Sequence, residues 1–151
     1  MTVTNRAATA AFSVLALGCG AASSRLGVDA GRLAPCPSVR PCVSSQAADT
    51  GRAVEPLAYD GTREQARKRL GEIIRSLPRA QVVTEASDYV HAVFPTPIVG
   101  IFGCADDLEV YLDDREKLAH FRSSSRIRPF DFGANKSRVE EIRRKFLAAK
   151  S

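Results

Sequence analysis

A block of strand-like segments between two amphipathic helix patterns constrains the fold of this 151-residue chain more than any other feature. Alternating and β-branched apolar residues recur from Gln81 to Ser125 without a helical period. Short links between successive strands favour an antiparallel meander, and strands in one block argue for the α+β class. We expect strands at Gln81–Glu85, Tyr89–Phe94, Ile98–Cys104, Asp107–Leu112 and Lys117–Ser125.

Two helices are expected to cover one face of this sheet. Gly61–Leu77 carries an apolar stripe at helical spacing, and Thr62 with Gln65 forms a capping-box pattern. A second stripe ends the chain, where Ser137 with Glu140 forms the same pattern. The other sheet face would be half polar and exposed. The predicted fold is therefore an antiparallel meander of four to five strands with two helices packed on one face.

The first residues have the pattern of an export signal. A basic start precedes the apolar run Ala7–Gly18, which is too short to span a bilayer. Small residues directly before Cys19 match the cleavage box of bacterial lipoproteins, in which this cysteine becomes lipidated. Ordinary signal cleavage near Gly18 or Ala21, and a buried apolar helix, are the alternatives. We expect a lipoprotein-type signal peptide at 1–18, a flexible tether at 19–32 and a single globular domain at 33–151.

This organisation predicts a location in the bacterial cell envelope, on the periplasmic side, with a membrane anchor through the lipid on Cys19. A soluble periplasmic protein is the alternative. In an oxidising compartment, Cys36 and Cys42 are expected to close a small loop as a disulfide. Two thiols are too few for a closed zinc site, so we predict no metal site and no cofactor. Cys104 lies in an apolar run and is expected to be a small buried residue.

The net charge of +5 is modest, and its excess lies toward the C-terminal end. Net charge of this size can favour anionic partners, but it does not specify one. The sequence has no helix-turn-helix or zinc-finger spacing and no basic stretch interleaved with stacking aromatics. Nucleic acid is therefore not expected as a partner.

The stretch His120–Arg138 is the densest in groups that could do chemistry. If Leu108 and its alternate neighbours face the core, one strand places Ala119, Phe121, Ser123 and Ser125 on the core face. Its outer face then carries His120, Arg122, Ser124 and Arg126. The same register sets Asp107 opposite Arg122 and Glu109 opposite His120, and a slip of one residue would bury the charges.

Three hypotheses compete for this surface. In the structural one, Arg122 and Arg126 pair with Asp106, Asp107 or Asp131. The turn and cap of the last helix then come from Asp131, Gly133, Asn135 and Ser137.

In the second hypothesis the outer row binds an anion, because two arginine forks on one strand face suit carboxylate or phosphate. Its residues would be Arg122, Ser124, Arg126, His120 and Asp107. Partners would be an anionic small molecule, a lipid headgroup or an envelope protein.

The third hypothesis is an enzyme of unassigned class that uses Asp106, Asp107, His120, Arg122 and Arg126. His91 is a further candidate base, and Ser124 or Cys42 a candidate nucleophile. The sequence carries no GxSxG elbow, HExxH pair or P-loop. No reaction can therefore be assigned from motifs.

Four segments in order resemble the successive motifs of the domain-of-unknown-function family 1499. They are Pro41–Ala47, Asp106–Glu109, Arg122–Arg126 and Asp131–Arg138. The resemblance extends from about Leu33 to Leu147. It departs at Arg128–Phe130, where many members have a glycine and a small polar residue. The resemblance implies a compact bacterial or plastid protein, often with an export signal or membrane segment, and no established activity.

Overall fold

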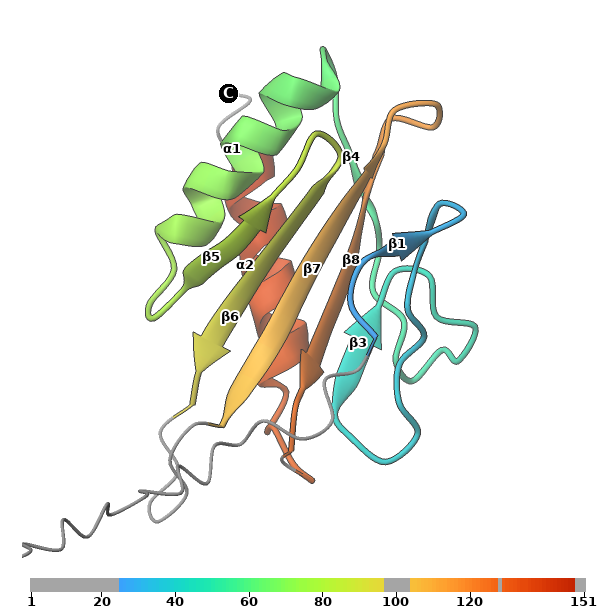
Figure 1. Ribbon diagram of the computed structural model, residues 1–151, viewed down its shortest axis with the longest axis vertical. Coiled ribbons are helices and arrows are strands. Elements are labelled where there is room, and N and C mark those ends of the chain that lie inside the picture. The colour runs from blue at the N-terminus through green and yellow to red at the C-terminus, as the bar shows by residue number, and fades with distance from the viewer. Residues whose placement is uncertain (1–24, 97–103, 128, 149–151) are drawn as a thin grey trace, which may run out of the picture.

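The computed structural model describes residues 25–96, 104–127 and 129–148. An antiparallel six-stranded sheet forms one layer, and two helices form the second layer on one of its faces (Figure 1). The strands are β1 (Val28–Asp29), β2 (Arg32–Leu33), β3 (Cys42–Ser44), β4 (Leu57–Ala58), β5 (Gln81–Glu85), β6 (Tyr89–Pro95), β7 (Ala105–Asp113) and β8 (Leu118–Ser125). The helices are α1 (Arg63–Arg75) and α2 (Ala134–Ala148).

The predicted α+β meander is confirmed. Strands β5 to β8 follow one another in chain order, and β3 then pairs with the free side of β8. β4 also pairs with β8, and all the ladders of this sheet are antiparallel. The strand expected at Ile98–Cys104 lies almost wholly outside the described residues. Within them, buried Cys104 directly precedes β7.

α1 forms as its sequence predicts. Thr62 accepts the Gln65 amide, and the Gln65 side chain accepts the Thr62 amide, so both halves of the capping box are present. The buried stripe includes Ala66, Leu70 and Ile74. It packs on the sheet together with Val139, Ile142 and Phe146 of α2, which gives one continuous apolar core.

α2 begins earlier than its sequence pattern indicates. The expected capping box of Ser137 and Glu140 is wrong, because the helix already begins at Ala134 and Ser137 lies in its first turn. The Asp131 carboxylate accepts the backbone N–H groups of Gly133 and Asn135 instead. An aspartate side chain that bonds its own following backbone therefore starts the helix.

The pairing of β7 with β8 differs from the expected register by two residues. Glu109 lies opposite Arg122, and Asp107 lies opposite Ser124. The reason is the hairpin loop: Asp113 pairs with Leu118, so four residues connect the strands. Because strand side chains alternate with a period of two, this shift changes partners but not faces.

The N-terminal part of the domain lies on the sheet face opposite the helices. β1 and β2 form a hairpin that contacts β7 and β8, and Figure 1 shows β1 beside β3 in front of the sheet. Residues 28–32, which the sequence assigns to a tether, thus take part in regular structure. No helix within the described ranges is long and apolar enough to cross a membrane.

Candidate functional site

Arg122 and Glu109 form an ion pair that is fully buried on the sheet face away from the helices. Nη1 of Arg122 donates to Oε2 of Glu109 at 2.6 Å, and both side chains are 0% exposed. Oε1 of Glu109 accepts the Tyr89 hydroxyl and the Gly27 amide, each at 2.7 Å. The expectation that this face is exposed is therefore wrong here. Pairing neutralises the charges, and the N-terminal segment reaches over them.

Two donors of Arg122 stay without a partner. Its Nε and Nη2, and the Ser124 hydroxyl two positions along β8, make no hydrogen bond within the described structure. Buried polar groups without a hydrogen-bond partner lower the stability of the folded state, so Arg122 and Ser124 on β8 are not placed for maximal stability. Its burial also removes Arg122 and Ser124 from direct contact with a ligand in solution.

Asp107 accepts hydrogen bonds from two partners on the same sheet face. Arg126 reaches it with both Nε and Nη2, at 2.9 and 2.8 Å, and Nε2 of His91 lies 2.8 Å from Oδ1. Burial by itself raises the pKa of Asp107, but the bonds from Arg126 and His91 outweigh it and hold the pKa at about 2.

This low pKa makes the domain sensitive to acid. Asp107 is 1% exposed, and its pKa is depressed on folding from 3.8 to about 2. Its contribution of about 2 kcal/mol is present above the unfolded pKa and is lost as pH falls through the folded one. We expect the free energy of unfolding to fall between pH 4 and pH 2. Asp107→Asn should remove that part of the slope in urea titrations, whereas the exposed Asp29→Asn should keep it.

The helix face carries a second polar cluster at the same end of the sheet. Nη2 of Arg138 donates to Oδ2 of Asp106 at 2.9 Å, and its guanidinium stacks over the Phe94 ring at 4.2 Å. Nη1 donates to the Ser123 hydroxyl and to Oδ1 of Asn135. The start of α2 is thereby tied to β6, β7 and β8.

Asn135 uses all four of its side-chain hydrogen bonds. Oδ1 accepts from Ser123 at 2.7 Å and from Arg138 at 3.0 Å. Nδ2 donates to Ser125 at 3.0 Å and to Asp131 at 2.8 Å. An amide offers two donors and two acceptor lone pairs, so this buried side chain is saturated. Of the predicted turn residues, Asp131 starts the helix and Asn135 fixes its first turn to β8.

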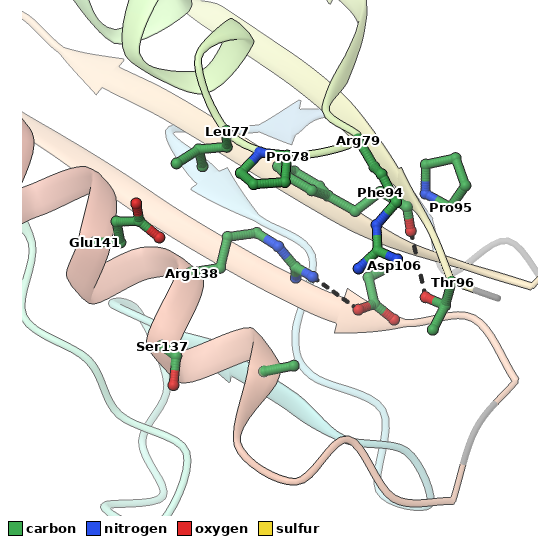
Figure 2. A pocket seen from close by; sticks show the side chains of 11 residues that line it. Leu77, Pro78, Arg79, Phe94, Pro95, Thr96, Asp106, Ser137, Arg138 and Glu141 are labelled. Carbon is green, nitrogen blue, oxygen red and sulfur yellow. Dashed lines mark hydrogen bonds and ion pairs between the residues drawn. The ribbon is translucent and has the colours of Figure 1, made fainter. Parts of the chain in front are cut away.

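A pocket of 340 Å³ opens beside this cluster (Figure 2). The α1–β5 turn, the end of β6, the start of β7 and the first turns of α2 enclose it. Its apolar walls are Leu77, Pro78, Phe94 and Pro95, and its polar lining includes Arg79, Thr96, Asp106, Ser137, Arg138 and Glu141.

The two arginines of this pocket differ in their engagement. Arg138 is held by Asp106, Ser123 and Asn135. Arg79 is exposed, and its side chain makes no hydrogen bond or ion pair with the described residues. Figure 2 shows Arg79 extending from the turn into the pocket, toward the Asp106 carboxylate. The pocket therefore presents one uncommitted guanidinium above a neutralised ion pair.

A larger groove of 880 Å³ lies on the opposite sheet face. His120 lines it, and Nδ1 of His120 lies 3.2 Å from the Ser45 hydroxyl, which also accepts the Phe121 amide. Partial burial lowers the pKa of His120. Asp113 and Asp114 also line the groove, but their carboxylates accept bonds within the β7–β8 turn.

The predicted outer row is thus divided. His120 lines the groove, and Arg126 is half-buried against Asp107, whereas Arg122, Ser124 and Asp107 are buried. Asp106 points to the other face, into the 340 Å³ pocket. Cys42 is not a free thiol, because the predicted disulfide with Cys36 is present at 2.03 Å.

Sequence reasoning missed Arg79 and Phe94 as site residues. No motif marks them, because Arg79 stands alone after Pro78 and Phe94 reads as an ordinary core position. Three separated chain segments bring them together with Arg138.

Fold and site together define a small disulfide-containing α+β domain in which most of the charged motif side chains pair with one another inside the protein. The model of the family described as Protein of unknown function (DUF1499) matches residues 32–146, which is most of the chain. The protein belongs to this family, and the resemblance seen in its motifs is confirmed. No curated protein and no solved structure matches the chain.

Proposed function

We propose that this protein is an exported, lipid-anchored domain of the bacterial cell envelope that binds a small anionic ligand and performs no reaction. Export and anchoring are supported by the signal-like residues before Cys19 and by the Cys36–Cys42 disulfide, which suits an oxidising compartment. The ligand would bind in the 340 Å³ pocket. The observation that carries this proposal is the uncommitted guanidinium of Arg79 at that pocket.

The chemistry of the pocket favours a singly charged anion with an apolar group. The planar fork of Arg79 suits a carboxylate or a phosphate ester. The first turn of α2 adds the positive end of a helix dipole to the same wall. Phe94 and Leu77 offer apolar surface for the remainder of the ligand. Glu141 at the rim disfavours a highly charged polyanion.

A binding role is favoured over an enzyme because Asp106, Asp107 and His120 do not come together in one cavity. Asp106 and Asp107 point to opposite faces of the sheet, and each is engaged by an arginine. His120 lines a different cavity from Asp106. Among the described residues, these three groups therefore do not face a common substrate.

Phenylacetate is a suitable probe, with acetate and benzyl alcohol as its separate anionic and apolar halves. We expect phenylacetate to raise the melting temperature of the protein more than either half, because binding to the native state stabilises it. Arg79→Asn should raise the dissociation constant for phenylacetate, measured by calorimetry, by about ten-fold or more. Asparagine suits this site, because Arg79 has a φ of 62° and asparagine tolerates positive φ.

Arg115→Asn is the matched control. Arg115 is an exposed arginine in the β7–β8 turn, and it lines the larger groove instead of this pocket. Equal losses in both variants would show non-specific charge attraction and refute the pocket. Loss in Arg115→Asn alone would move the site to the groove with His120.

A further inference from the structure

One end of the domain concentrates exposed apolar side chains. The loop that joins β8 to α2 exposes Phe132 by 98% and Phe130 by 71%, and Ile127 is also exposed. Val39, in the loop before β3, is 78% exposed. The other exposed large apolar side chains of the described residues stand on other segments; they are Leu26, Val83 and Leu147. Contiguous exposed apolar side chains mark an interaction site, whereas isolated ones do not.

The two loops are neighbours. Arg40 donates to the backbone carbonyl of Arg126, and Ser125 donates its amide to the carbonyl of Pro41. Val39 and Pro129 line the same shallow groove. Figure 1 shows both loops at the end of the sheet where β8 finishes and α2 begins. Val39, Ile127, Phe130 and Phe132 therefore lie at the same end of the domain, called here the phenylalanine end.

Phe132 is held in a conformation that a phenylalanine seldom adopts. Its φ is 52°, in the left-handed region, and Gly133 follows with a φ of 79°. The Asp131 carboxylate fixes this turn through the amides of Gly133 and Asn135. Glycine or asparagine would fit this backbone with less strain. A strained backbone that presents a fully exposed aromatic ring motivates a functional hypothesis.

The charges around the phenylalanine end indicate its partner. Arg40, Arg52 and Lys136 line the groove between its two loops, although Arg52 is engaged there by Asp49 and by the carbonyls of Pro37 and Ser38. Among the described residues that line this groove, the one carboxylate is that of Asp131, and it accepts the amides that start α2. Protruding aromatic rings flanked by cations fit a bilayer with anionic headgroups, where rings enter the interface and basic side chains meet phosphate.

We propose that the phenylalanine end inserts Phe130 and Phe132 into the interface of an anionic lipid bilayer. This contact does not require the lipid anchor of the proposed function. A lipid on Cys19 would strengthen it, because the seven-residue span from Cys19 to Leu26 keeps Leu26 within about 25 Å of the anchor. The anchored domain would then lie with its phenylalanine end against the membrane.

The chain contains no tryptophan, so a single introduced tryptophan reports one position. The full chain with Phe132→Trp is mixed with vesicles of phosphatidylglycerol and phosphatidylcholine. We expect a blue shift of the emission maximum and quenching by brominated lipids. The matched control is Val83→Trp, which probes an exposed apolar position on β5, and its emission should not change. The local reporter separates loop insertion from any binding by the apolar residues before Cys19.

Two further variants test the aromatic and the basic side chains of this contact separately. Phe130→Ser combined with Phe132→Asn should reduce vesicle partitioning of the Cys19→Ser chain by about ten-fold or more. Arg40→Glu with Lys136→Glu should reduce binding to anionic vesicles and make it less sensitive to salt. Unshifted emission of Phe132→Trp on vesicles that carry the bound protein would overturn the proposal. An equal shift at Val83→Trp would overturn it as well, because insertion would not be specific to this end.

Discussion

Replacing Arg122 with methionine is expected to lower the free energy of unfolding by about 3–5 kcal/mol, because Glu109 would stay buried without its counter-charge. The two side chains are completely shielded and joined at 2.6 Å. Replacing both, as Glu109→Leu with Arg122→Met, should restore much of the loss, because apolar residues of similar volume need no pairing. Recovery should be incomplete, since the Tyr89 hydroxyl and the Gly27 amide would lose their acceptor. Urea unfolding followed by circular dichroism measures all three variants.

Arg115→Met provides the reference for this cycle, because Arg115 is an exposed residue of the β7–β8 turn. Its effect should stay within about 0.5 kcal/mol. A double variant as unstable as Arg122→Met alone would contradict the assignment. The cost would then come from the lost guanidinium itself and not from the stranded carboxylate.

Asn135→Asp is expected to destabilise the domain by about 3 kcal/mol or more, although it changes a single atom. The new carboxylate would lose two donors and place an oxygen at the 2.8 Å contact with Asp131. It would also leave the Ser125 hydroxyl without its donor. Repulsion between the new buried carboxylate and the partly buried Asp131 carboxylate adds to these losses and raises the pKa of one of them. The measurement is the free energy of unfolding at pH 7 and pH 5, with a smaller loss expected at the lower pH.

Ser137→Asp is the matched control, because it adds the same charge to the same helical turn at an exposed position. A carboxylate near a helix N-terminus interacts favourably with its dipole, so this variant should be neutral or slightly stabilising. An equal cost in both variants would mean that charge in the first turn, and not the saturated amide, sets the penalty.

The fold class could be predicted because it depends on local patterns. The buried face of α1 follows from apolar residues at helical spacing, which are Ala66, Leu70 and Ile74. The buried face of β7 follows from alternating apolar residues, which are Leu108, Val110 and Leu112. The register of β7 and β8 depends instead on the length of one turn, and a two-residue shift preserves the hydrophobic pattern. Patterning alone therefore identified the faces but not the partners across them.

The site was less predictable for two physical reasons. A charged residue on an alternating strand reads as exposed, and only tertiary pairing shows that Arg122 and Glu109 can be buried. The pocket at Arg79 is assembled from four separated segments, and the two that supply Arg79 and Phe94 carry no motif. The resemblance to the family indicated the extent of the domain, but it offered no function to transfer.

Asp106 and Asp107 also restrict how the chain can change length. They are neighbours on β7, and they engage Arg138 of α2 on one face and Arg126 on the other. Inserting or deleting one residue in β7 would turn each carboxylate toward the wrong layer, because strand side chains alternate. Loops outside the β7–β8 hairpin can vary in length without this penalty. The Asp106–Asp107 pair therefore fixes which side chains of β7 face the helices and which face the opposite side. Those loops outside the hairpin are free to change in both length and sequence.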